Sequence, residues 1–157
     1  VFSTLHTNDA PSTLNRMVDM GLEPFLVASS TNLILAQRLG RKLCTQCRER
    51  IELPPSLQEN LQLADIGGPD GGEYYKAVGC AACHDTGYRG RTGFYEVMPI
   101  SGTIREMIIK QSSTPEIKRQ ALKEGMISLR MDGLLKLKTG ITSAEEVLKE
   151  TAADEEA

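Results

Sequence analysis

The sequence predicts a mixed α/β chain, and three observations support that prediction. Residues 1–43 show apolar segments in the order strand, helix, helix, strand. Residues 44–100 contain two Cys-x-x-Cys pairs and are rich in Pro and Gly. From residue 101 onward, apolar side chains recur at helical spacing in several short stretches. The first pattern is half of an α/β unit, with too few strands for a complete sheet.

The first helix has start and stop signals. Val1–Leu5 suits a short buried strand, and Asn8 or Asp9 can cap the helix that follows. Pro11 is tolerated in a first helical turn, and Gly21 is placed to end the helix. We therefore expect the chain to pass from a strand through a polar turn into a helix.

The next stretches alternate between apolar segments and breakers. A second helix is expected after Pro24, and Leu33–Leu39 is compatible with a strand. Pro54–Ile66 is expected to form one short helix, and Gly67–Gly72 a loop. Thr92–Met98 is expected to form the next strand.

The last region predicts a series of short helices with recognisable caps. Thr114 followed by Pro115 indicates an N-cap with proline at the first helical position. Ser143, with Glu146 three residues later, has the spacing of a capping box. Residues after Thr151 are small and acidic, so we expect a frayed tail.

Composition excludes several classes of function. Apolar residues make up 40% of the chain and charged residues 25%, which is ordinary for a globular protein. Aromatic residues make up only 4%, with no Trp, and the net charge is -3, so a general nucleic-acid binder is disfavoured. No stretch approaches the ~18 uninterrupted apolar residues of a membrane span. The chain begins with Val, and we expect it to be a fragment of a longer protein.

The two Cys-x-x-Cys pairs, Cys44/Cys47 and Cys80/Cys83, are the strongest chemical signal. Each pair lets two sulfurs point at one centre, and two pairs complete a four-sulfur shell around Zn²⁺. Disulfides would need an oxidising compartment, and nothing in the sequence indicates export. A thioredoxin-like redox motif would need one pair at a helix start, and the sequence has two matched pairs. Iron is a further alternative, because it accepts the same four ligands. We favour structural zinc, because a closed shell leaves no position for substrate.

Basic residues surround the first pair. They can balance the charge of about -2 that four thiolates leave on zinc, or they can form a docking patch for nucleic acid or protein. His84 directly follows the second pair, and we expect it at the surface or beside the ligands. The flanking cations are Arg38, Arg41, Lys42, Arg48 and Arg50, opposed only by Glu49.

His6 lies in a polar run after the expected first strand. Ligands of α/β folds bind beyond the carboxyl ends of strands, so this run can contact phosphate or position water. The alternative is a polar turn that only caps the next helix. No Walker A motif (G-x-x-x-x-G-K-[ST]) occurs, so the chain lacks the usual cradle for triphosphate and Mg²⁺.

Several motifs in one order resemble a known family, the secretion ATPases of type II secretion and type IV pilus assembly. Residues 3–10 (STLHTNDA) resemble its His box, and residues 37–44 (QRLGRKLC) resemble the run into its zinc motif. Residues 80–98 resemble its second zinc half and the following strand. Residues 131–136 and 140–148 resemble its C-terminal helices.

The resemblance implies the C-terminal portion of a RecA-like P-loop ATPase core, with a tetracysteine zinc-binding insert and a C-terminal helical subdomain. Residues 1–43 would be a partial core from the His box onward, and 44–100 the zinc subdomain with its following strand. Residues 101–151 would be the helical subdomain, and 152–157 an acidic tail.

The resemblance also implies a function: a cytoplasmic hexameric motor, peripheral at the inner membrane, that uses ATP and Mg²⁺ to drive pseudopilin or pilin assembly. His6 would sense the γ-phosphate region, and Arg38 would lie near the nucleotide. The zinc subdomain would dock on the inner-membrane platform or on cytoplasmic assembly proteins. The chain alone is expected not to hydrolyse ATP. Two alternatives stay open: a zinc-stabilised docking module without motor function, and a nucleic-acid-binding zinc ribbon.

Overall fold

The structure, a computed structural model, describes residues 1–154 of the chain. By internal contacts the chain forms two compact units. Unit 1 comprises Val1–Gln37 and Glu96–Ser128, and unit 2 comprises Arg38–Tyr95 and residues 129–154. Each unit thus combines stretches from different predicted regions, and the predicted division into domains stays a prediction. No helix among residues 1–154 is long and apolar enough to cross a membrane.

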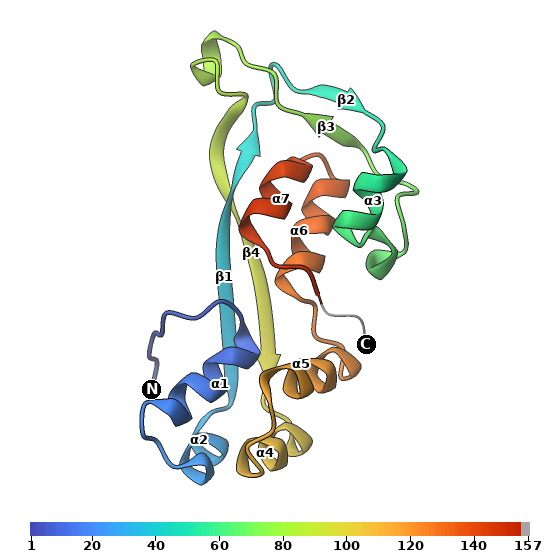
Figure 1. Cartoon of the computed structure of the whole chain (residues 1–157). Coiled ribbons are helices and arrows are strands. Elements are labelled where there is room, and N and C mark those ends of the chain that lie inside the picture. The colour runs from blue at the N-terminus through green and yellow to red at the C-terminus, as the bar shows by residue number, and fades with distance from the viewer. Residues whose placement is uncertain (155–157) are drawn as a thin grey trace. The chain divides into compact units, whose positions relative to one another are not determined.

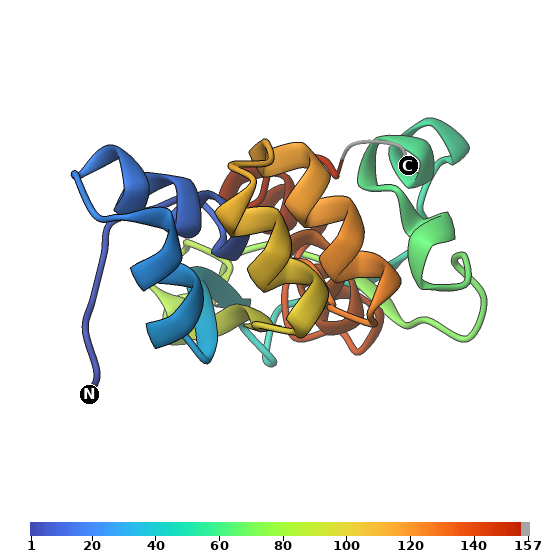
Figure 2. The same ribbon diagram turned by 90° about the horizontal axis from the view of Figure 1, so that it is seen from below.

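Unit 1 contains four short helices, the first residues of one long strand and the last residues of another. The helices are α1 (Ala10–Asp19), α2 (Pro24–Ser30), α4 (Gly102–Ile109) and α5 (Thr114–Lys123). α2 packs against α4 and α1 against α5, and Figure 2 shows α4 and α5 side by side. Their apolar faces meet in one core, because each helix is polar on its other side. The core residues are Ala10, Leu14, Val27, Ala28, Ile34, Met98, Ile100, Ile104, Ile108, Ile117, Ala121 and Met126.

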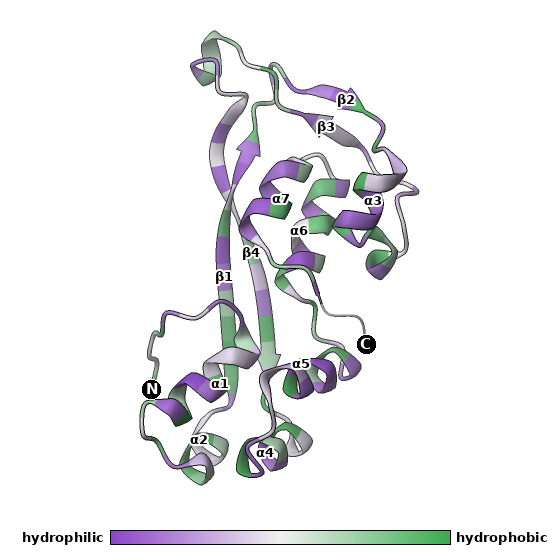
Figure 3. Ribbon diagram, viewed as in Figure 1, coloured by the Kyte–Doolittle hydropathy of each residue, from purple (hydrophilic) through white to green (hydrophobic). Residues whose placement is uncertain are grey.

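Two long strands, β1 (Leu33–Leu43) and β4 (Tyr88–Pro99), pair in a two-stranded sheet. They run in opposite directions (Figure 1). Figure 3 shows that β1 is hydrophobic where it starts and hydrophilic toward its end. Both strands extend beyond the predicted ranges, and the mixed α/β class is confirmed.

Unit 2 adds a small two-stranded sheet and the helices α3, α6 and α7. β2 (Glu49–Ile51) pairs antiparallel with β3 (Tyr74–Lys76), with Glu49 opposite Lys76. Between them lie α3 (Pro55–Leu61) and a 3₁₀ turn, η1 (Leu63–Ile66). A second 3₁₀ turn, η2 (Ala81–Cys83), precedes β4, and α6 (Leu129–Lys138) and α7 (Ala144–Glu150) follow unit 1 in sequence. The predicted helices after residue 101 are confirmed.

The predicted strand at Val1–Leu5 is wrong. These residues are irregular and exposed, with Val1 and Phe2 fully in solvent. A strand must satisfy its backbone groups on a neighbouring strand. Among the described residues the strand pairs are β1–β4 and β2–β3, so residues 1–5 have no such neighbour. The apolar pattern is compatible with a strand, but the pattern alone does not provide the neighbouring strand that pairing requires.

The single helix predicted over Pro54–Ile66 is also wrong, because it is interrupted at Gln62. This residue adopts a left-handed conformation (φ 60°) that separates α3 from η1. Its side chain then binds the backbone of Asp154 twice, at 2.7 and 2.9 Å. Residues 152–154 are therefore held against unit 2, contrary to the expectation of a frayed tail, while 155–157 lie outside the described residues.

The helix caps are largely as predicted. The Asp9 side chain accepts the Ser12 N–H, and Gly21 ends α1 at φ 96°. At α5 the cap lies one residue earlier than predicted, at Ser113 with Glu116. At α7 only half of the predicted box forms. The Ser143 hydroxyl accepts the Glu146 N–H, but the Glu146 carboxylate binds elsewhere.

Candidate metal centre

The four cysteines come together in unit 2. Their sulfurs all lie within 4.8 Å of one another. Cys44 Sγ is 3.8 Å from Cys80 Sγ, Cys47 Sγ is 3.8 Å from Cys83 Sγ, and the Cys80 and Cys83 sulfurs are 3.7 Å apart. Two pairs from distant parts of the sequence thus converge on one point.

The β2–β3 pairing explains how 32 residues between the pairs are bridged. Cys44 directly follows β1, and Cys47 lies two residues before Glu49, the first residue of β2. The antiparallel register sets Glu49 opposite Lys76, so the chain returns toward its starting point before Cys80. The intervening segment with α3 and η1 packs against α7 and α6 and does not separate the pairs. A Pro- and Gly-rich insert can therefore be long and still leave the cysteines adjacent.

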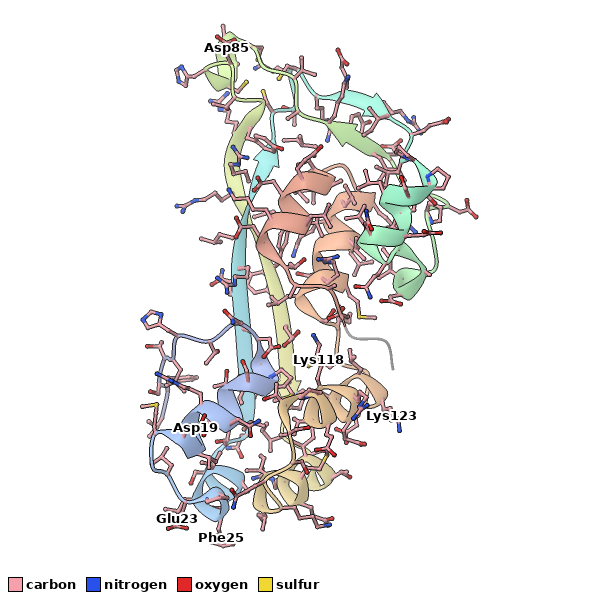
Figure 4. The ribbon with its side chains drawn as sticks, in the orientation of Figure 1. Asp19, Glu23, Phe25, Asp85, Lys118 and Lys123 are labelled. Atoms are coloured by element: carbon pink, nitrogen blue, oxygen red, sulfur yellow. The ribbon has the colours of Figure 1, made fainter. Side chains whose placement is uncertain are left out.

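Each cysteine pair lies in a tight turn, and the residues next to the cysteines have the backbone conformations and hydrogen bonds that this turn needs. In the first turn, the Arg48 N–H donates to the Cys44 carbonyl at 3.0 Å. In the second, His84 and Asp85 both have positive φ, at 51° and 60°. Asp85, labelled in Figure 4, lies at this turn. A Cβ on Gly87 (φ 79°) would approach the Ala77 Cβ to 2.6 Å, so this turn requires glycine there.

Backbone N–H groups point at two of the sulfurs. Gly79 donates to Cys47 Sγ at 3.3 Å, and Cys80 and Gly87 each donate to Cys83 Sγ at 3.2 Å. Burial raises the pKa of the Cys83 thiol, but these donors and the neighbouring sulfurs outweigh burial and bring it to about 6. Burial raises the pKa of Cys47, only partly offset by Gly79, and its bonds to the other sulfurs raise it further, to about 11. The site therefore favours at least one thiolate.

The arrangement fits a tetrahedral four-sulfur metal site. Zinc–sulfur bonds of ~2.3 Å at tetrahedral angles imply sulfurs about 3.8 Å apart. The observed 3.7 and 3.8 Å separations agree with this value. The N–H···S bonds supply the second set of contacts that orients metal-binding thiolates. These four cysteines can thus hold a metal ion and leave no ligand position for a substrate.

Several predicted neighbours of the site have other partners. Arg41 donates to the buried Glu146 carboxylate through its backbone N–H at 2.8 Å and through its guanidinium at 2.7 and 2.9 Å. Its guanidinium also lies 4.0 Å from the Tyr88 ring centre. Arg48 donates to the Gly140 carbonyl and stacks on a tyrosine ring. His84 is exposed, as expected.

The family of the chain follows from comparison with known proteins. The family model described as Type II/IV secretion system protein matches residues 1–149. The chain belongs to this family. The match covers almost all of the described residues, including the four cysteines and both histidines.

Curated relatives in this family are pilus and secretion proteins. The chain is 49% identical to the type IV pilus assembly ATPase PilB of Myxococcus xanthus, over 98% of this chain and 27% of that protein. It is 45% identical to the type II secretion system protein E of Aeromonas hydrophila, over 98% of this chain and 30% of that protein. It is 45% identical to the type IV pilus assembly ATPase PilB of Pseudomonas aeruginosa, over 96% of this chain and 26% of that protein. The chain thus spans less than a third of the length of these relatives.

The two residues predicted to lie near a nucleotide belong to different units. His6 is exposed in the irregular segment before α1, in unit 1. Arg38 is half-buried in β1, in unit 2. Their roles at a nucleotide stay predictions.

Two buried carboxylates were not predicted from the sequence. Glu96 on β4 is 1% exposed, and Glu146 on α7 is 1% exposed. A signal for Glu96 existed, because strand alternation places it on the same side as Phe94 and Met98. For Glu146 the capping-box pattern pointed to the wrong partner.

Proposed function

We propose that this chain is the C-terminal part of a cytoplasmic ATPase that powers pseudopilin or pilin assembly, in type II secretion or in type IV pilus formation. The proposal rests chiefly on the family match over residues 1–149. It is supported by relatives named as pilus assembly ATPases and as a type II secretion system protein, at 45–49% identity over nearly the whole chain. Those relatives are several times longer, and the remainder of such a protein would supply the rest of the motor.

In this proposal the longer protein supplies the ATP and Mg²⁺ site. The chain has no Walker A loop, and that loop is what cradles the phosphates and positions Mg²⁺ in P-loop ATPases. His6 contributes an imidazole near the γ-phosphate, and Arg38 lies near the nucleotide. The working assembly is a hexamer at the cytoplasmic face of the inner membrane.

The metal we propose is Zn²⁺, held by Cys44, Cys47, Cys80 and Cys83. Zinc supplies no catalysis in a closed four-thiolate shell, and it acts by crosslinking the loops that carry its ligands. The first pair joins β1 to β2, and the second joins β3 to β4. We propose that this stiffened end of unit 2 docks on the inner-membrane platform or on a cytoplasmic assembly protein.

The decisive experiment replaces Cys80 with Ser in the longer protein and measures zinc content and pilus assembly or secretion together. Cys80→Ser is expected to lose zinc and to impair assembly strongly. His84→Ala is the matched control, since this exposed side chain lies four residues from Cys80 and is not among the four clustered thiols. Normal assembly by a variant that has lost its zinc would disprove the proposed role.

The ATPase part of the proposal has its own test. The purified longer protein is expected to hydrolyse ATP, and the 157-residue chain alone is expected to show none. Turnover by the chain alone that disappears in His6→Ala would show that it carries a complete site. Absence of turnover by the longer protein under assembly conditions would disprove the motor function.

A further inference from the structure

A charged side chain interrupts the apolar row on the inner side of β4. Along this strand the buried residues alternate with exposed ones, and the buried positions are Phe94, Glu96 and Met98. Phe94 and Met98 are 0% exposed, and Glu96 is 1% exposed. A buried carboxylate costs several kcal/mol unless it is well hydrogen-bonded, ~2–7 kcal/mol even for a neutral polar group. Such a position demands a specific partner.

One partner lies at the start of α1. The backbone N–H of Ala10 donates to Glu96 Oε1 at 2.8 Å, across 86 residues of sequence. Ala10 is itself 0% exposed, so water cannot take over this donor. A carboxylate at this end also interacts favourably with the positive pole of the helix dipole. Glu96 therefore both satisfies a buried donor and fixes the position of the first residue of the helix.

The other backbone N–H groups at the start of α1 need no distant acceptor. Pro11 has no N–H, and the Ser12 N–H donates to the Asp9 carboxylate at 2.9 Å. The Thr7 hydroxyl shares a hydrogen bond with the Thr13 hydroxyl at 2.7 Å and donates to the Asp9 carbonyl at 3.3 Å. Residues 7–9 are thus tied to the same turn that Glu96 holds. These bonds set where the chain leaves the helix toward His6.

We infer that Glu96 is a positioning residue for His6. The inference rests on the proposed function, in which His6 meets the nucleotide. Glu96 holds the Ala10 N–H, the turn holds residues 7–9, and His6 is the next residue along the chain. The acceptor for this buried donor comes from β4, 86 residues away in the sequence, and not from the turn itself. The carboxylate from β4 connects the polar segment to the core of unit 1.

Two measurements test the inference in the longer protein. The first is hydrogen exchange at the Ala10 amide, which does not depend on ATP turnover. Loss of a hydrogen bond to a charged acceptor, worth ~1.5–3 kcal/mol, should speed exchange by about 10- to 150-fold in Glu96→Ala. Glu96→Gln keeps an oxygen acceptor and should stay close to wild type. Met98→Ala is the control, since it opens a cavity in the same row but leaves the Glu96 carboxylate in place as the acceptor of the Ala10 N–H.

The second measurement is a double-mutant cycle on ATP hydrolysis. If Glu96 acts through His6, then kcat falls at least about 10-fold in Glu96→Ala, and the double variant with His6→Ala is no slower than His6→Ala alone. A buried residue with a merely structural role would give effects that multiply, as we expect for Met98→Ala with His6→Ala. Where Glu96→Ala does not fold, Glu96→Asp carries the same test, because its shorter side chain keeps the charge but misses the Ala10 N–H.

The outcomes separate the inference from the proposed function. Unchanged exchange at Ala10, or effects of Glu96→Ala and His6→Ala that multiply, overturns the inference while the ATPase function stands. A wild-type protein that hydrolyses no ATP removes the proposed function. A His6→Ala variant with normal turnover removes the role of His6, and with it the positioning role of Glu96.

Discussion

Unit 1 and unit 2 differ in the interactions that stabilise each of them. Unit 1 has a continuous apolar core contributed by four helices and the ends of two strands. Unit 2 has an apolar core of its own around Leu134 and Leu137, and adds to it buried polar links and the cysteine cluster. One such link is Arg130, which is 3% exposed and donates to the Thr151 hydroxyl at 2.7 Å. In unit 2 these directional bonds tie a segment that Pro and Gly interrupt. In unit 1 the helices pack mainly through complementary apolar faces, and the hydrogen bond from Ala10 to Glu96 is a buried polar link within that core.

The largest expected effect is loss of the proposed zinc ion from unit 2. Cys44→Ser removes one of four ligands, and structural zinc sites in small peptides contribute apparent free energies of about 10–16 kcal/mol. We expect hydrogen exchange to increase by orders of magnitude around residues 44–48 and 79–87 of unit 2. The α1 amides of unit 1 should stay protected. Equal loss of protection in both units would contradict the separation.

The next effect belongs to unit 1. Ile104 is 0% exposed in the core, so Ile104→Ala should lower the free energy of unfolding by about 2–5 kcal/mol. Ile109 lies on the same helix but is 48% exposed, and Ile109→Ala serves as the control with a change below about 1 kcal/mol. Urea unfolding measures both variants. The proposed zinc ion should remain bound in both variants, and its loss in Ile104→Ala would show that the stability of unit 2 depends on the core of unit 1.

A smaller effect is expected at the ion pair of unit 2. The Arg41 guanidinium is half-exposed, whereas the Glu146 side chain is 2% exposed. Arg41→Ala leaves the buried carboxylate without its guanidinium partner. Allowing for solvent screening at Arg41, we expect a loss of about 1–3 kcal/mol. Arg89→Ala, an exposed cation on β4, should change stability by less than about 0.5 kcal/mol. Similar losses of stability in Arg41→Ala and Arg89→Ala would mean that the ion pair of Arg41 with Glu146 contributes no more than an ordinary surface charge.

The smallest effect concerns pH. Burial raises the pKa of Glu146, but its bonds with Arg41 outweigh burial and hold the pKa below its ordinary value. Stability from this pair is therefore fully present above the unfolded pKa of about 4.3 and is lost as pH falls through the lower folded pKa. The free energy of unfolding between pH 5 and 3 should fall more steeply in wild type than in Glu146→Gln. Parallel curves would rule out this linkage.

Local signals in the sequence predicted much of the fold and of the site. The Asp9 cap, the Gly21 stop and the Cys-x-x-Cys spacing each depend on a few adjacent residues, and the structure has all three. The failures occur where a local pattern had two compatible outcomes. Val1–Leu5 has a strand pattern without a neighbouring strand. Pro54–Ile66 has a helical face, but Gln62 leaves the helix to bind the backbone of Asp154.

By itself, then, the sequence determined the α/β class, most helix ends and the four cysteines as one set of ligands, because short-range geometry and residue chemistry decide these features. Only the tertiary structure decided which distant groups meet. Glu96 meets Ala10 across 86 residues, and Arg41 meets Glu146 across 105. The physical reason is that a buried charge must find a partner wherever the packed chain presents one. Sequence spacing carries no record of that partner.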